Sequence, residues 1–394
     1  MQKSETQHIS VHCILACLYF LLLPTSIAVT SPSNSILKLV TIPIGLYFLI
    51  TLMLSNRKLH INNVHLALLL FTLLIASTLF VAADTISIYH VTGYILNAAL
   101  YLCLTVIPYN KKEMEWMERV QIILLVLLNV MTLFSNGSRF DRTTLVIMGQ
   151  TCDPNYFVGF FIFPVTITLK NLVSGKYRLF YLLLIGISMY SIFLSGSRGG
   201  FLAVAVTFAG FAFLYPDDLA KRILFLVGGG VLLAGLWFIL RPVLPENIVE
   251  RMSVEAVVET GGTGRTDIWV SMIREIVDQP VKLLFGRGIN AKHEVFVNGV
   301  WDGVAAHNQL IQVVYNQGLV GLLSFLLLTG VCFFRCVKRR KTVSIAILGM
   351  MALSVSLSFN QTTRTFWNLI AYAAFAFPED EIKSKNSGGI SDHE

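Results

Sequence analysis

Twelve long apolar runs recur along this 394-residue chain and limit the folds that it can adopt. Hydrophobic residues make up 55% of the sequence and charged residues only 13%. A soluble domain of this length would not be so apolar, whereas helices of about 20 such residues cross roughly 30 Å of hydrocarbon. We therefore predict an all-α protein with about 12 transmembrane helices. The expected spans cover residues 11–30, 36–54, 64–83, 86–106, 119–134, 156–173, 179–194, 201–215, 223–240, 319–334, 343–359 and 366–377.

Lysine and arginine residues fall in alternate loops, and this pattern predicts the orientation of the chain. Short cytoplasmic loops are enriched in these residues. The basic set holds Arg57, Lys58, Lys111, Lys112, Lys176, Arg178, Lys221, Arg222, the cluster at 335–341 and the tail residues Lys383 and Lys385. Both termini are therefore predicted to be cytoplasmic. The net charge of +7 is mostly this bias, so it gives no reason to expect nucleic-acid binding.

Four arginines break this rule by falling in the short outer loops: Arg139, Arg142, Arg198 and Arg364. A bound anion or a carboxylate partner would offset the cost of placing them there. An arginine at the end of a span can also extend to the interface without any ligand. Arg198 stands in a polar turn, Ser-Gly-Ser-Arg-Gly-Gly at residues 195–200, and cations clustered at this edge of the bilayer would suit a phosphate-bearing lipid.

One outer loop is much longer than the others and divides the chain. We expect an N-terminal transmembrane bundle at 1–240 with an uncleaved first span, a large extracytoplasmic loop at 241–317, C-terminal transmembrane helices at 318–377 and a cytoplasmic tail at 378–394. Within the loop, Gly-Gly-Thr-Gly-Arg-Thr-Asp-Ile-Trp at 261–269 predicts a glycine turn that opens a helix, capped by Thr263 or Thr266 and ended by Pro280. Arg265 at that helix start would favour an anion, although glycine before a capped helix is common.

Three further outer residues are candidates for chemistry or for local structure. His307, before an amphipathic stretch that leads into the tenth span, could act as a general base because a histidine pKa lies near 6.5. It could equally be a surface hydrogen-bonding residue. Asn308 could orient the ring or a substrate. Asp153, in Asp-Pro-Asn at 153–155, most simply caps the next helix, and it could instead pair with an outer arginine.

The six cysteines indicate neither a disulfide framework nor a metal site. Cys152 alone falls in an outer loop. The pairs Cys13/Cys17 and Cys332/Cys336 have helical spacing on apolar segments and lack a histidine or carboxylate beside them, which favours packing. We therefore expect no metal.

Taken together, these motifs resemble the O-antigen ligase and polymerase superfamily. The resemblance rests on the turn at 195–200, Gly-Arg-Thr-Asp-Ile-Trp at 264–269, Ala-His-Asn at 306–308 before Gly318, and the segment 153–155, in that order along residues 145–330. It implies a metal-independent, inverting glycosyltransferase of the bacterial plasma (inner) membrane with a GT-C-like helical fold. Its active site would lie on the outer, periplasmic face, and a lipid-facing cleft would admit a polyprenyl chain.

The resemblance also implies partners and roles for particular residues. The donor would be a glycan on undecaprenyl diphosphate, held in the membrane lipid, and no cofactor would be needed. Arg198 and Arg265 would bind the diphosphate and His307 would deprotonate the acceptor hydroxyl, while Arg142 and Arg364 are weaker candidates for further phosphate contacts. Two arginines suit this task because they can neutralise the charge on a departing diphosphate.

Three functions remain open at this point. A polymerase would use a lipid-linked glycan as acceptor, and a ligase would use a lipid A core, a wall polymer or a protein. We favour the polymerase slightly. A polysaccharide or lipid transporter or flippase is the alternative from another class, for which charges inside the spans would be expected.

Overall fold

The computed structural model describes residues 8–28, 36–54, 59–134, 138–139, 142–147, 150–253, 265–297, 300–357 and 363–376. Most of this part of the chain is helical, and its strands are few and short. Each of the expected spans contains a helix: α1 (Val11–Leu21), α2 (Lys38–Leu54), α3 (Asn63–Ser77), α4 (Thr85–Thr105), α5 (Lys111–Leu133), α6 (Pro154–Ser174), α7 (Arg178–Leu194), α8 (Arg198–Leu214), α9 (Leu219–Leu240), α14 (Gln309–Cys336), α15 (Lys341–Leu353) and α16 (Arg364–Ala374).

Six of these helices are long and apolar enough to cross a membrane, counting only the described residues. They are the segments Asn63–Phe80, Thr85–Thr105, Lys111–Leu133, Pro154–Ser174, Leu219–Val243 and Gln309–Cys336. The other helices have 11 to 17 residues. At ~1.5 Å per residue they reach about 16–26 Å, which is short of the hydrocarbon thickness. Twelve crossings therefore stay a prediction.

The first expected span, 11–30, was wrong as a single helix. Helix α1 ends at Leu21, and a 3₁₀ helix, η1 (Leu23–Ala28), follows it. Pro24 stands at this change and has no backbone N–H to continue an α-helical ladder. Two other helices begin earlier than hydrophobicity indicates, because Asn110 and Asn308 cap α5 and α14 upstream of the apolar residues.

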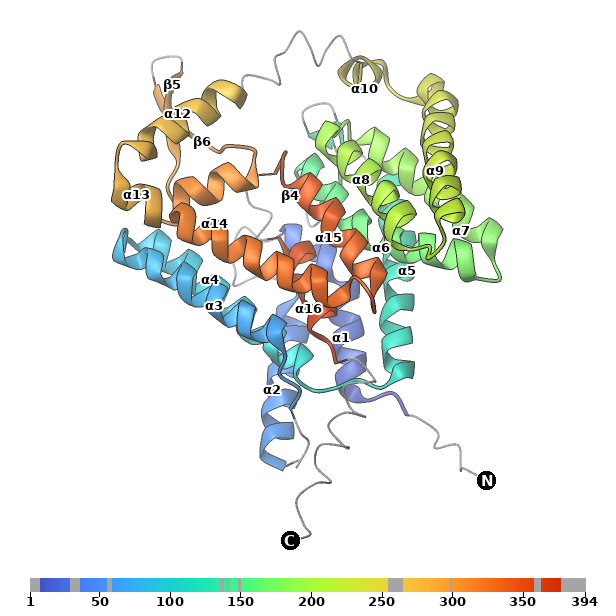
Figure 1. Ribbon diagram of the computed structural model, residues 1–394, viewed down its shortest axis with the longest axis horizontal. Coiled ribbons are helices and arrows are strands. Elements are labelled where there is room, and N and C mark those ends of the chain that lie inside the picture. Colours follow the sequence, from blue (N-terminus) through green and yellow to red (C-terminus); the bar gives the residue numbers. More distant parts are fainter. Residues whose placement is uncertain are drawn as a thin grey trace.

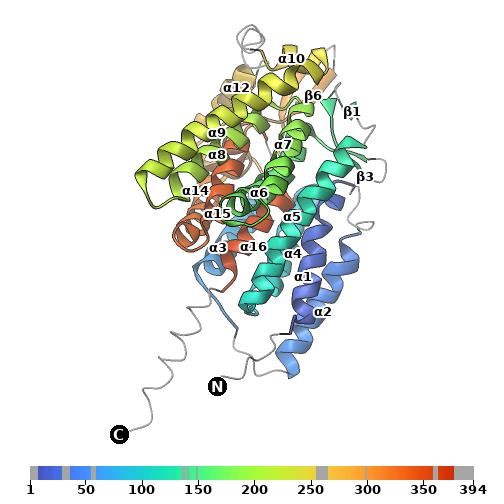
Figure 2. The ribbon, with the colours of Figure 1, turned by 90° about the vertical axis from the view of Figure 1, so that its right-hand side faces the viewer.

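The large loop contains helices α10 (Glu246–Arg251), α12 (Arg265–Val277) and α13 (Pro280–Phe285). It also contains an antiparallel hairpin, β5 (His293–Val297) with β6 (Val300–Val304), which was not predicted. Two smaller hairpins lie before α6: β1 (Ser138–Arg139) with β2 (Arg142–Thr143), and β3 (Val146–Ile147) with β4 (Gln150–Thr151). The loop elements gather at one end of the helical bundle, and the starts of α1 and α5 lie at the opposite end (Figures 1 and 2).

Close helix packing and buried hydrogen bonds hold the bundle together. Helices α8 and α15 approach through Gly349, where a Cβ atom would lie 2.1 Å from Thr207 Oγ1. Between α5 and α7, Asn129 donates to Ser188 Oγ (2.9 Å) and accepts from Ser191 Oγ (2.8 Å). A buried polar group that is satisfied in this way stabilises a helix pair in an apolar surrounding.

Helix α9 lies at the edge of the bundle and none of its residues is buried (Figure 1). Its exposed side chains include Ile223, Leu224, Val227, Val231, Phe238 and Ile239. An apolar face of this size would aggregate in water, so it is suited to contact with lipid.

Candidate active site

The polar turn predicted at 195–200 connects α7 to α8. Gly196 has a φ of 53°, and a Cβ atom on it would lie 2.9 Å from Ile248 Cδ1. Both facts favour glycine there. Ser197 caps α8 by accepting from the backbone N–H of Gly200 (2.9 Å) and donates to Asn155 Oδ1 (2.6 Å). These bonds fix Arg198 as the first residue of α8.

Arg251, at the end of α10, is bonded to this turn in a reciprocal way. Arg198 Nε donates to the carbonyl oxygen of Arg251 (2.8 Å), and Arg251 Nε donates to that of Gly196 (3.0 Å). The two guanidinium groups are therefore held near each other although 53 residues separate them in the sequence. Two neighbouring cations repel each other, which makes this position favourable for an anion.

Arg265 begins α12 and joins this pair. Burial lowers its pKa, the charges of Arg251 and Arg198 lower it further, and the carboxylate of Asp153 opposes them. These interactions place three arginines within electrostatic reach of one another at one end of the bundle. We call Arg198, Arg251 and Arg265 the arginine cluster.

His307 lies beside the arginine cluster, in the short link between β6 and α14. Partial burial lowers its pKa, the charge of Arg265 lowers it further, and Asp153 acts in the opposite direction. The imidazole is therefore neutral near pH 7. His307 is also partly exposed, so a substrate can reach the ring.

The link that carries His307 is anchored on both sides. Trp269 Nε1 donates to the carbonyl oxygen of Ala306 (2.6 Å), and the backbone N–H of Ala306 donates to Gln312 Oε1 (2.8 Å). His307 itself has a positive φ of 49°, which is uncommon for a residue other than glycine. Such strained conformations cluster at functional sites, where surrounding contacts hold them.

Asp153 and Asn308 both act as helix caps. Asp153 accepts from the backbone N–H groups of Asn155 (2.8 Å) and Tyr156 (3.3 Å) at the start of α6. The predicted capping role is therefore present. The carboxylate also raises the pKa of Arg265 and of His307 through its charge, while its pairing with an arginine stays a prediction. Asn308 accepts from Leu310 N (3.0 Å) and Ile311 N (3.4 Å). Its contact with a substrate stays a prediction.

The two weaker candidates lie in different places. Arg142 is buried beneath the polar turn, with its Cδ 3.2 Å from the position that a Cβ of Gly196 would take. Arg364, at the start of α16, donates to Asn97 Oδ1 of α4 and interacts with the tyrosines at 19, 101 and 156. Arg142 is therefore next to the arginine cluster, while Arg364 belongs to a separate polar group.

The start of α12 differs from the sequence-based prediction. Thr266 is the second residue of α12 and so does not cap it, because the helix already begins at Arg265. Thr263 and the glycines at 261, 262 and 264 lie outside the described residues. Within the described ranges, no group of three or more histidine, cysteine or acidic residues could hold a metal ion.

The residues just described coincide with a family match. A family model described as O-antigen ligase matches residues 181–326. This match confirms the resemblance to the O-antigen ligase and polymerase superfamily, and it covers the arginine cluster and His307. No curated protein matches the chain. Residues 181–326 are thus similar to the O-antigen ligase family, and the apolar helices of the described residues suggest a multi-pass membrane protein.

Arg251 is the residue of this site that sequence analysis missed. It stands in the long loop at 241–317 without a recognisable motif around it. Its charge gave no signal, because the bias of lysine and arginine toward the cytoplasm applies to short loops.

Proposed function

We propose that this protein transfers a glycan from undecaprenyl diphosphate to an acceptor hydroxyl during the biosynthesis of a bacterial surface polysaccharide, and that it acts as a polymerase. The observation that carries the proposal is the arginine cluster beside His307. Hydrogen bonds and electrostatic interactions link Arg198, from the turn before α8, with Arg251, Arg265 and His307 from the long loop, so three cations and one neutral base lie at the same end of the bundle.

The arginine cluster suits a diphosphate in charge and in geometry. A guanidinium offers a planar fork of donors that matches phosphate oxygens, and it stays protonated in proteins. When the glycosidic bond breaks, negative charge grows on the diphosphate oxygen that leaves the sugar. Cations already fixed around that oxygen stabilise the transition state without reorganisation.

His307 suits the other half of the reaction. Because its pKa is lowered, the ring is neutral and can accept the proton of the acceptor hydroxyl. The hydroxyl oxygen then attacks the anomeric carbon, and the bond to the diphosphate breaks with its electron pair on the phosphate oxygen. A single displacement of this kind inverts the anomeric configuration. We propose that it needs no metal, since the arginines supply the positive charge.

The proposed location is the bacterial inner membrane, with both termini in the cytoplasm and the site on the periplasmic face. The basic residues of the alternate loops support this orientation. The exposed apolar side chains of α9 support a lipid surrounding.

Deletion of the gene tests the choice between polymerase and ligase. Envelope glycans and lipid-linked intermediates are resolved on gels from the deletion strain and from strains complemented with wild type or His307→Ala. Accumulation of single lipid-linked repeat units without long chains is expected for a polymerase, with rescue by wild type only. Long chains accumulating on the carrier would indicate a ligase, and an unchanged glycan profile would contradict both.

A further inference from the structure

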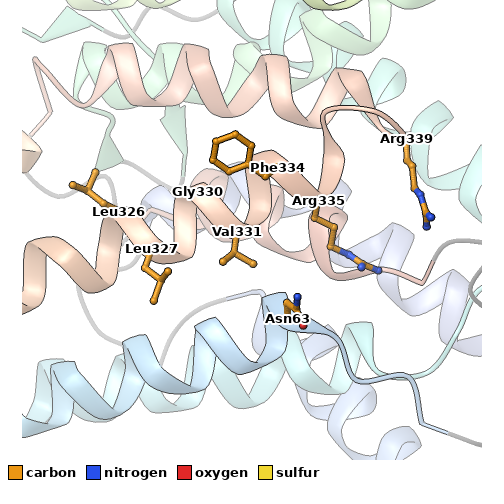
Figure 3. Close-up of a pocket in the computed structure, with 8 residues that line it drawn as sticks. All are labelled: Asn63, Leu326, Leu327, Gly330, Val331, Phe334, Arg335 and Arg339. Atoms are coloured by element: carbon orange, nitrogen blue, oxygen red, sulfur yellow. The ribbon is translucent and has the colours of Figure 1, made fainter.

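A groove of about 630 Å³ lies between α3 and α14 (Figure 3). Its lining residues on α14 belong to the C-terminal half of that helix, whereas His307 precedes the N-terminus. Arg335, at its edge, is about 26 Å along the helix from the kink at Gly318. The groove is therefore separate from the candidate active site. Its volume falls in the range of about 300–1,000 Å³ that is typical of small-molecule sites.

The walls of this groove are divided into an apolar part and a basic part. Leu326, Leu327, Val331 and Phe334 supply the apolar wall from one face of α14, and Phe334 is 74% exposed. Arg335 and Arg339 lie at one end, where α14 finishes, with Asn63 of α3 opposite (Figure 3). Among the described residues that line the groove, none is acidic.

The basic end has a fixed shape because it is built on the C-terminus of α16. Arg335 Nε donates to the carbonyl oxygen of Ala373 (3.1 Å), and Arg340 donates to those of Tyr372 (2.6 Å) and Ala376 (2.8 Å). Asn62, before α3, donates to the carbonyl oxygen of Ala374 (2.6 Å). Side chains beside both α3 and α14 thus donate hydrogen bonds to the carbonyl groups at the C-terminus of α16. These shared contacts set the spacing of α3 and α14.

Two arginines and, among the described residues, no carboxylate line the groove, while most of its wall is hydrocarbon. A molecule that complements both parts has an acyl chain and an anionic headgroup.

We propose that this groove binds an anionic phospholipid of the leaflet opposite the candidate active site, with its phosphate against Arg335 and Arg339 and one acyl chain along Leu327, Val331 and Phe334. Basic pockets between membrane helices bind lipid headgroups in this manner. Arginine suits the contact because it can donate two parallel hydrogen bonds to a phosphate.

Gly330 provides a way to fill the groove without disturbing the bundle. It lines the groove, and a Cβ atom on it would meet nothing within 4 Å. Gly330→Leu should therefore place a side chain where the acyl chain lies. Gly228→Leu is the matched control, because Gly228 is also in a helix and its Cβ position is also open, but it lies on α9.

A second pair of variants, one test and one control, addresses the basic end of the groove. Arg339→Gln removes a cation that lines the groove, while Lys338→Gln removes the neighbouring cation, which does not line it. Both side chains are exposed, so neither change should affect folding. The Arg339 variant thus keeps the test decisive if Gly330→Leu fails to fold.

In the experiment, full-length protein is incubated with mixed micelles that contain phosphatidylcholine and phosphatidylglycerol in equal amounts. Native mass spectrometry then counts the lipids that each protein retains. Wild type should retain phosphatidylglycerol preferentially. Arg339→Gln and Gly330→Leu should each weaken this retention about tenfold, whereas Lys338→Gln and Gly228→Leu should leave it unchanged.

Several results would overturn the proposal. Equal retention of the two lipids would indicate an apolar crevice without headgroup recognition. Wild-type retention in both groove variants would place the lipid elsewhere. A dimer that Gly330→Leu dissociates would identify the groove as a contact between two copies of the chain. The readout is lipid binding, so it is independent of glycan transfer.

Discussion

The charge of Arg265 should control the pH dependence of glycan transfer through His307. Three substitutions separate this effect from loss of substrate binding. Arg265→Gln removes the charge, Arg265→Lys keeps it, and Asp153→Asn removes the opposing carboxylate. Asparagine is also a good helix N-cap, so the last variant preserves the start of α6.

The direction of each shift follows from the causes of the lowered His307 pKa. Burial lowers it first, the charge of Arg265 lowers it further, and Asp153 raises it. A general base works only when neutral, so the rate falls as pH drops through this pKa. Arg265→Gln should move that fall to higher pH, Asp153→Asn should move it to lower pH, and Arg265→Lys should leave it in place.

The transfer rates at high pH, where His307 is neutral in every variant, test the contribution of Arg265 to catalysis separately from its effect on the pKa. Loss of a donor that stabilises charge in a transition state lowers the rate about 10²–10³-fold, which is the loss expected for Arg265→Gln. Lysine keeps the charge without the fork. The loss of one charge-assisted hydrogen bond, about 1.5 kcal/mol, corresponds to a rate roughly tenfold lower for Arg265→Lys.

The assay measures initial transfer rates of purified protein in lipid nanodiscs, from about pH 5 to about pH 9, with a diphosphate-linked glycan donor. It tests both the shift of the pH profile and the loss of rate. Circular dichroism of each variant serves as the folding control. If the acid side of the profile for Arg265→Gln coincides with that of wild type, Arg265 does not act on the base. If Arg265→Gln and Asp153→Asn shift it in the same direction, the electrostatic reasoning is wrong.

Three other outcomes are expected. Arg251→Ala should lower transfer about 10–100-fold by removing one charged donor, while Arg241→Ala, an exposed residue of the same loop, should keep the wild-type rate; equal rates would remove Arg251 from the site. Gly196→Ala should cost about 1–2 kcal/mol of stability because of its positive φ and close neighbours, measured by thermal unfolding against Gly228→Ala, and an unchanged Tm would contradict this. EDTA should leave transfer unchanged, and restoration of a lost rate by an added divalent ion would contradict the arginine mechanism.

Hydrophobicity located the apolar helices well and their ends poorly. It depends on side chains that face lipid or the core, whereas a helix begins where a cap satisfies its first N–H groups. Helix α5 starts at Lys111, before its apolar residues, because Asn110 and Glu113 form a capping box. The Asn110–Glu113 spacing was visible in the sequence.

The β5–β6 hairpin could have been predicted. The sequence has Asn298-Gly299 between two segments rich in valine and aromatic residues, which is a strong hairpin signal. In a chain dominated by helical patterns it was overlooked. The two-residue strands before α6 are too short for any periodic signal.

Sequence motifs identified Arg198, Arg265 and His307, but their proximity could not be derived from the sequence. Arg251 joins them only through tertiary hydrogen bonds with the polar turn. Arg364 had the same outer-loop signal and lies instead with Asn97 and a group of tyrosines. An arginine in a short loop that is expected to be outside has a special environment, but only the fold shows whether that environment is the arginine cluster or another polar group.

The most direct test of the central claim compares purified wild type with His307→Ala in one assay that measures both donor binding and transfer. We predict that His307→Ala binds the diphosphate-linked glycan as tightly as wild type and does not transfer it, because the arginine cluster is intact and the base is missing. Transfer by His307→Ala at the wild-type rate would contradict the account, and so would loss of donor binding in that variant.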